Sequence, residues 1–321
     1  MRNLILNKMA TREALGKALV EVGKEIKDVV VLDADLCEST KTVEFKKQFP
    51  SRFFDCGIAE CNMIGVAAGL SCVGKIPFAA SFAVFVALRA LEQIRNSVCY
   101  TNLNVKIIGS HSGLSAAEDG ATHQALEDIA VLRAMPNMKI VVPCDFVETL
   151  AAVKQAAIEK GPIYLRTSKF EVKSINRLEY LNEFKIGKAV VLKKGSLVCL
   201  FTTGVMVHFS LEAAKLLEAD GVSTMVVNVH TIKPLDEELI LSVAKNVEFL
   251  FSVEEHSKVG GLGETIASFL SEIFPKKMFK IATDDKFSES GSVQELFKKN
   301  ELNEVLIYKK VKSVVLKKTL Q

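Results

Sequence analysis

Four side chains capable of acid–base chemistry lie close together near the middle of the chain. His111, in the string GSHSGLS, is followed by Glu118, Asp119 and His123 in the string EDGATHQ. His111 follows a β-branched run, so it is expected just beyond the carboxyl end of a strand, where parallel α/β sheets bind their ligands. Histidine is also the side chain most used for proton transfer near neutral pH. A turn or helix cap would explain EDG equally well, so position alone leaves a functional site and a surface turn as alternatives.

A fifth candidate is Glu60, in the string FFDCGIAECNMIGVAAGL, at the opening of an apolar helix predicted over residues 62–72. A carboxyl group with Ile58 and Met63 as neighbours would be partly removed from water and suited to hold or share a proton. A glutamate in the first turn of a helix is also favourable for helix stability alone. From the residues alone, this second interpretation is preferred.

Two phenylalanines, Phe82 and Phe85, have i, i+3 spacing in the string SFAVFVALRALEQIR. This string is predicted to be helical over residues 82–100. Aromatic residues at helical spacing pack in protein cores more often than they form a platform for a flat ligand. The spacing by itself therefore indicates core packing.

The elements that must position these residues alternate between strands and helices. We expect strands over 27–36, 76–80, 105–110, 138–142 and 163–166, and helices over 11–26, 62–72, 82–100, 127–134 and 147–159. Such alternation is typical of a parallel sheet covered by helices. A polar, charged stretch over 169–185 is typical of a linker.

A second alternation follows the linker. Strands are expected over 197–204, 223–236 (with a turn) and 247–256, and helices over 210–220, 237–246, 263–274 and 288–302. Residues 305–318 are ambiguous between strand and helix. The fold class is therefore α/β, with two parallel-sheet-based three-layer domains at residues 1–185 and, smaller, at 186–321.

Length and composition exclude several classes of protein. The chain has 321 residues, of which 49% are hydrophobic and 25% charged, as in ordinary globular proteins. A net charge of +3 with scattered lysines gives no sign of nucleic-acid binding. No apolar run approaches the length of a membrane span, and the patch LIL near the N-terminus is too short for a secretory signal. We expect a cytoplasmic protein with no membrane or nucleic-acid partner and no metal ligands of its own.

Several strings together resemble the pyrimidine-binding domain of transketolase. They are DCGIAECNM, PFAASFAVF, IGSHSGLSAAEDGATHQALEDIAVLRAMPNM and GPIYLRTSK, in the same order and at similar spacing. Further along, TIKPLD, VEEHSKVGGLGE and FSESGSVQEL resemble the C-terminal domain of that family. The resemblance covers nearly the whole chain and corresponds to the C-terminal half of a transketolase.

The resemblance implies that Glu60 is catalytic and binds thiamine diphosphate. In transketolases, the glutamate at this position hydrogen-bonds N1′ of the cofactor's aminopyrimidine and promotes the imino tautomer that removes the thiazolium proton. By the same resemblance, Phe82 and Phe85 line the pyrimidine pocket, where aromatic faces can stack on a flat heterocycle. These implications reverse the interpretations drawn from the residues alone.

The resemblance also implies a set of substrate ligands. His123 aligns with a histidine that contacts the substrate and is counted as catalytic, and Asp119 aligns with a residue that binds a donor hydroxyl. The implied ligands of the sugar phosphate are Arg12, Ser39, His111 and Lys169. Lys169 stands where the family usually has arginine, and lysine keeps the charge but loses the bidentate geometry.

One family feature is missing from this sequence. Transketolases bind the diphosphate through Mg²⁺ with a Gly-Asp-Gly segment followed by Asn-Asn, and neither string occurs here. The resemblance therefore implies a separate N-terminal transketolase subunit that carries the Mg²⁺ ligands, in an α2β2 assembly with sites between the subunits. The implied activity is transfer of a two-carbon ketol unit from a ketose to an aldose, with or without a phosphate on either sugar. Large obligate interfaces are apolar, and the predicted helices 62–72 and 82–98 are candidates.

Three alternatives remain open. The chain could be half of an enzyme similar to deoxyxylulose-phosphate synthase, or the beta subunit of a 2-oxoacid dehydrogenase. His111 and the string EDGATHQ favour transketolase over both. It could also be a scaffold subunit without catalytic function, although the presence of Glu60, Asp119 and His123 argues against that.

Overall fold

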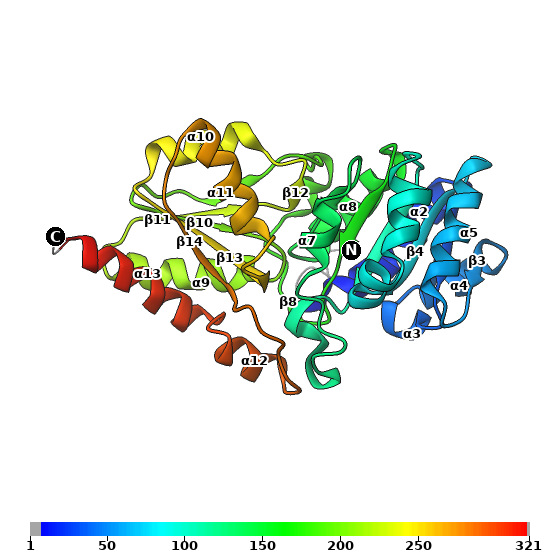
Figure 1. Ribbon diagram of the computed structural model, residues 1–321, viewed down its shortest axis with the longest axis horizontal. Helices are drawn as coiled ribbons and strands as arrows, with labels where there is room; N and C mark the ends of the chain where they lie inside the picture. Colours follow the sequence, from blue (N-terminus) through cyan, green and yellow to red (C-terminus); the bar gives the residue numbers. More distant parts are fainter. Residues whose placement is uncertain (1–7, 320–321) are drawn as a thin grey trace.

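A computed structural model describes residues 8–319 of the chain. Residues 1–7, which include the short apolar patch LIL, and residues 320–321 lie outside the described part. Two α/β units lie side by side, each built on its own sheet (Figure 1). No helix within residues 8–319 is long and apolar enough to cross a membrane.

The first sheet has seven strands in the order β12-β6-β7-β5-β4-β2-β3. All neighbouring strands run parallel except β12, which is antiparallel to β6. Their bounds are β2 (Val29–Asp33), β3 (Phe53–Asp55), β4 (Ile76–Phe82), β5 (Lys106–Ser110), β6 (Lys139–Val141), β7 (Ile163–Arg166) and β12 (Thr231–Lys233). Because the parallel strands point the same way, their carboxyl ends share one edge of the sheet.

Helices cover both faces of this sheet, as the alternation of side chains in β2 requires. Val29 and Val31 pack in the cluster that contains α2 (Thr11–Glu25), α4 (Val43–Gln48) and α8 (Phe146–Ile158). Val30 and Leu32 pack instead in the cluster that contains α5 (Glu60–Cys72) and α7 (Asp128–Arg133). The result is the expected three-layer arrangement.

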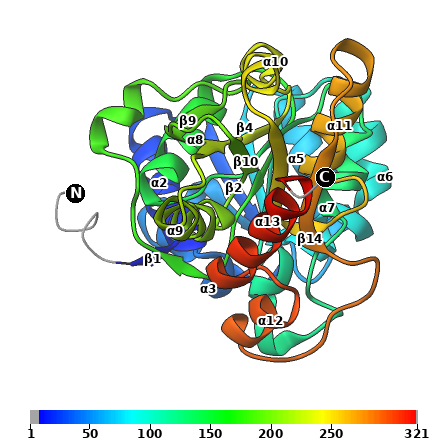
Figure 2. The same ribbon diagram turned by 90° about the vertical axis from the view of Figure 1, so that its left-hand side faces the viewer.

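The second sheet is smaller and has the strand order β14-β13-β10-β11-β9. It consists of β9 (Val190–Lys193), which is antiparallel, and of β10 (Val198–Thr202), β11 (Thr224–Asn228), β13 (Phe249–Ser257) and β14 (Met278–Thr283). On one face lie α9 (Met206–Ala219), α12 (Val293–Lys299) and α13 (Glu304–Thr319), as Figure 2 also shows. On the other lie α10 (Glu237–Asn246) and α11 (Leu262–Ile273).

The α/β fold class with two sheet-based units is confirmed. Several local predictions differ from the structure. Phe82 is the last residue of β4 and not part of a helix, and the predicted helix 82–100 is broken into η2 (Phe85–Arg89), α6 (Leu91–Gln93) and η3 (Ile94–Cys99). Both η segments are π-helical, a conformation often found at functional sites. The ambiguous stretch 305–318 lies within helix α13.

The supposed linker is also more ordered than its polarity suggests. Residues Glu171–Val172 form β8, which pairs with β1 (Met9–Ala10), and Leu178–Asn182 form the turn η5. In addition, β12 leaves the second unit and completes the first sheet, so the two units share more than one connection. The domain boundary between residues 185 and 186 stays a prediction.

Candidate active site

Four of the expected site residues meet at the carboxyl ends of β4 and β5. Phe82 ends β4, and His111 directly follows β5. Arg12 lies in the first turn of α2, and Ser39 lies in α3 (Cys37–Thr40). Nη1 of Arg12 donates to the carbonyl oxygen of Ser39 at 2.9 Å and lies 3.0 Å from Nε2 of His111. The structure therefore brings together residues that are far apart in the sequence.

The imidazole of His111 is buried, and its contacts define its tautomer. Because arginine only donates, Nε2 of His111 must accept from Arg12, and Nδ1 then carries the proton that it donates to Ser110 Oγ at 2.9 Å. Burial, followed by the charges of Arg12 and Lys169, lowers the pKa of His111 to about 3. His111 is thus a neutral hydrogen-bonding group among cations, which also include Lys41. An anionic group of a ligand would be favoured there.

An aromatic cluster joins the two candidate histidines. The Phe82 ring lies 4.0 Å from the ring of His111 and 5.9 Å from that of Phe85, with the two phenyl planes nearly parallel. His123 packs edge-on against Phe85 at 5.1 Å and against Phe82 at 6.1 Å. The carboxyl end of β4 therefore places both histidines around one apolar wall.

Glu60 begins α5 and is only 1% exposed. Its Oε1 accepts from Ser81 Oγ at 3.3 Å, and its Oε2 accepts from Nη1 of Arg89 at 2.6 Å. The guanidinium of Arg89 also lies over the ring of Phe85, 4.8 Å from its centroid. The planar guanidinium of Arg89 thus contacts both Glu60 and Phe85.

The remaining expected ligands, Asp119 and Lys169, lie nearer the protein surface. Asp119 is exposed at the end of the turn η4 (Gly113–Asp119). Lys169 is partly buried, and its Nζ lies 3.8 Å from Glu118 Oε2. The geometry shows where these residues lie, whereas their roles stay predictions.

Two arginines matter here that the sequence did not identify as site residues. Arg89 contacts Glu60 across 29 positions of sequence, and no spacing rule connects the two. Arg166 lies close to Lys169 in the sequence. It is 4% exposed and donates through Nε to Asp128 Oδ2 at 2.7 Å. Arg166 is therefore committed to a buried ion pair and is not a free ligand for a phosphate.

Side chains that could ligate a metal are dispersed over residues 8–319. No three side chains of His, Cys, Asp or Glu in that range lie close enough together to hold a metal ion.

The chain belongs to the transketolase family. Residues 7–174 match the transketolase pyrimidine-binding domain, and residues 187–304 match the transketolase C-terminal domain. Together these matches cover most of the chain and agree with the two sheets of the structure.

Two similar proteins of nearly the same extent as this chain are named as subunits. A 6-deoxy-6-sulfo-D-fructose transketolase subunit from Clostridium sp. (strain MSTE9) is 39% identical over 87% of this chain and 86% of its own length. An apulose-4-phosphate transketolase subunit from Phocaeicola vulgatus is 35% identical over 91% of this chain and 93% of its own length. Human transketolase is 40% identical, but the match covers only 42% of it.

A solved structure of similar extent has also been described. It is a split gene transketolase in the form of an inactive beta4 tetramer, 48% identical, with a TM-score of 0.88 and coverage of 95% of this chain and 98% of that one. A chain of nearly the same extent thus occurs in a split gene transketolase.

Proposed function

We propose that this chain is the C-terminal subunit of a split transketolase and transfers a two-carbon ketol unit from a ketose to an aldose with thiamine diphosphate. The observation that carries the proposal is the arrangement of buried Glu60 and of Phe85 around the guanidinium of Arg89, with His111 and His123 against the adjacent ring of Phe82. The family membership supports the class of reaction.

Glu60 and Phe85 would suit the aminopyrimidine of the cofactor, and the contacts of Arg89 support this assignment. Its planar guanidinium stacks over Phe85 and donates to Glu60. A flat heterocycle with a hydrogen-bond donor on its edge could make the same two contacts, stacking on the ring of Phe85 and donating to Glu60. Glu60 and Phe85 would hold the pyrimidine, and Arg89 would have to move aside for it.

Each residue then has a distinct task. When bound, thiamine diphosphate supplies the carbon nucleophile and the electron sink for cleaving the carbon–carbon bond. Glu60 would hold the proton shared with N1′, and His123 would contact the reacting part of the substrate. The remaining ligands, which surround the sugar and its phosphate, would be Arg12, Ser39, His111, Asp119 and Lys169.

A partner subunit would hold the charged end of the cofactor. Relatives of similar extent are named as transketolase subunits, and a structure of similar extent is a split gene transketolase, so the proposed partner is an N-terminal transketolase section, in an α2β2 complex. The exposed face of α5 supports a protein contact near Glu60, because Val66 is 38% exposed and Ile58, just before the helix, is 78% exposed. A cytoplasmic location stays a prediction.

Reconstitution tests the proposal. The chain alone and the chain mixed with the N-terminal transketolase section of the same organism are assayed with thiamine diphosphate, Mg²⁺, fructose 6-phosphate and an aldose phosphate. We expect ketol transfer only in the mixture. The donors named for the relatives, 6-deoxy-6-sulfo-D-fructose and apulose 4-phosphate, are tested in parallel, and absence of transfer with every donor would overturn the proposal.

A substitution at His111 tests the phosphate site. His111→Asn removes the imidazole but suits the left-handed backbone (φ 53°) of this position. We expect KM for a phosphorylated ketose to rise about 10-fold while kcat changes little, because the lost contact would stabilise ground and transition states alike. An unchanged KM in steady-state kinetics of the complex would contradict this role.

A further inference from the structure

The segment from His111 to Gln124, called here the substrate loop, has an unfavourable backbone conformation. His111 has φ 53°, and Ala117 has φ 58° and ψ −117°, although neither residue is glycine. Such conformations persist only where the surrounding structure enforces them, and they concentrate at functional sites. The contacts that hold this conformation come from β13, from the segment between β14 and α12, and from Arg166 at the end of β7.

The first of these contacts is made by Glu255 of β13. Its Oε1 accepts from the backbone N–H of Ser115 at 2.7 Å, in the middle of η4. The carboxyl group also lies against Gly113, where a Cβ would come within 2.7 Å of it. Gly113 has φ 64°, so this position combines a left-handed backbone with a close approach that only glycine allows.

The second contact comes from the segment between β14 and α12, which descends beside the loop (Figure 1). Nε2 of buried Gln124 donates to the carbonyl oxygens of Ala117 at 3.2 Å and Glu289 at 2.9 Å. Ser290 Oγ donates to the carbonyl oxygen of Glu118. The side chain of Gln124 thus links Ala117, whose backbone is strained, to the second unit.

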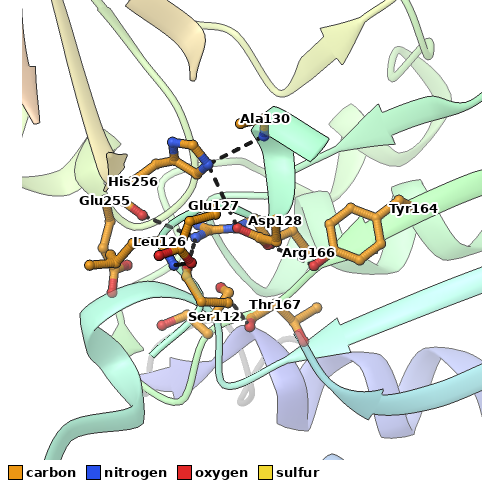
Figure 3. Close-up of polar contacts among 12 residues, drawn as sticks. Ser112, Leu126, Glu127, Asp128, Ala130, Tyr164, Arg166, Thr167, Glu255 and His256 are labelled. Carbon is orange, nitrogen blue, oxygen red and sulfur yellow. Dashed lines mark hydrogen bonds and ion pairs between the residues drawn. The ribbon is translucent and has the colours of Figure 1, made fainter. Parts of the chain in front are cut away.

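The third contact fixes Glu255 itself. Nη2 of Arg166 donates to the carbonyl oxygens of Ala125 at 3.1 Å and Glu255 at 3.0 Å, while its Nε binds Asp128. Figure 3 shows Arg166 between Asp128 and the β13 residues Glu255 and His256. Ala125, the residue that directly follows the substrate loop, and β13 are therefore held at one buried guanidinium.

We infer that Glu255 is a positioning residue, which holds the substrate loop in its binding conformation by accepting from Ser115. Through this contact the second sheet shapes the site without touching the substrate. The part of the inference that concerns substrate recognition rests on the proposed function, because it takes His111, Asp119 and His123 as substrate ligands.

The adjacent residue, Glu254, provides a matched control. It lies in the same strand, is fully buried, and accepts from the N–H groups of Leu262 at 2.6 Å and Gly263 at 2.8 Å. Its contacts are therefore to the start of α11 and not to the substrate loop. Loss of either carboxyl group removes buried hydrogen bonds, but only one of them supports the loop.

Amide hydrogen exchange of the chain without a partner tests the inference independently of any activity. In Glu255→Leu, peptides covering residues 113–119 should exchange about 10-fold faster, because the Ser115 N–H loses its acceptor. In Glu254→Leu, exchange should instead rise in residues 261–264. Burial raises the pKa of Glu255 to about 8, so Glu255→Gln resembles the neutral acid and should retain normal loop exchange.

Two results would overturn the inference. One is normal amide exchange of the substrate loop in a folded Glu255→Leu variant. The other is amide exchange that is accelerated equally across the whole chain in Glu255→Leu but not in Glu254→Leu. If Glu255→Leu does not fold, Glu255→Asp replaces it, because the shorter side chain withdraws the oxygen from Ser115 while keeping the carboxyl group.

The link to recognition is measured separately in the reconstituted complex. Variants whose substrate loop exchanges faster should have a KM for the ketose that is several-fold higher, with a smaller change in kcat. Glu255→Gln should keep the KM of the unmodified complex. A normal KM in a variant with a loosened loop would overturn this link. Absence of ketol transfer in the unmodified complex would count against the proposed function and not against the loop contact.

Discussion

Glu60→Gln is expected to lower ketol transfer by the reconstituted complex by at least about 100-fold, the range typical of lost proton-transfer groups. Glutamine keeps the size of the side chain and an oxygen that can accept from Arg89 or Ser81, which both contact Glu60 in the structure. It cannot share a proton with a ring nitrogen. The measurement is kcat of the complex with saturating thiamine diphosphate.

The control for this prediction is Glu44→Gln. Glu44, like Glu60, lies in the first turn of a helix, but it is half-exposed and pairs with Lys47 on the surface of α4. Its loss should leave ketol transfer unchanged. Both variants should form the complex normally in size-exclusion chromatography, and near-normal turnover by Glu60→Gln would disprove the catalytic role.

Asp128→Ala is expected to lower the free energy of unfolding by about 3–5 kcal/mol, as when one partner of a buried ion pair is removed. Asp128 is fully buried and accepts from Arg166 and from the hydroxyl of Tyr164, each at 2.7 Å. The substitution leaves the guanidinium of Arg166 buried without its counter-ion. Urea unfolding followed by circular dichroism measures the change.

The same ion pair predicts a dependence on pH. Burial opposes the ionisation of Asp128, but Arg166 and His256 hold its pKa below the usual value. A lowered carboxyl pKa contributes stability that is present above the unfolded-state pKa and lost as the pH falls through the folded-state value. The difference in unfolding free energy between the unmodified chain and Asp128→Ala should therefore shrink in acid.

An exposed ion pair provides the comparison. Glu21 and Lys24 contact each other at 2.8 Å on the surface of α2, and removing this pair with Glu21→Ala should cost less than about 1 kcal/mol. A similarly small loss for Asp128→Ala would show that Arg166 finds another partner, of which the nearby carboxyl group of Glu255 is the first candidate.

The sequence predicts the layers of the fold well because hydrophobic periodicity records burial directly. The β-branched runs that become β2 and β5 are buried on both faces, which only a sheet between two helical layers provides. The antiparallel edge strand β9 is not predicted, and the residues of β12 fall within the predicted strand and turn 223–236 without a sign that they pair with the first sheet. Their pairing depends on contacts between distant parts of the chain, which periodicity does not encode.

The candidate site, like the fold, is only partly predictable from the sequence. Spacing alone placed His111 at the end of a strand, but its contact with Arg12, 99 positions away, depended on the family resemblance. The Glu60–Arg89 contact had no signal in the sequence, because arginines on apolar segments are usually solvated at the surface. Phe82 was misplaced in a helix because β4 runs directly into η2, with Phe85 in the new element.

The exchange of β12 into the first sheet limits how the chain can be divided. A fragment ending at residue 185 would lack Thr231 and Lys233, which pair with Val141 and Ile140. Lys233 also donates to the carbonyl oxygens of Arg133, the last residue of α7, and of Met135. In this fragment β6 would become an edge strand of the sheet, and its unpaired backbone groups could bind strands of other chains. Chimeras that combine the halves of related subunits should therefore be joined beyond residue 233.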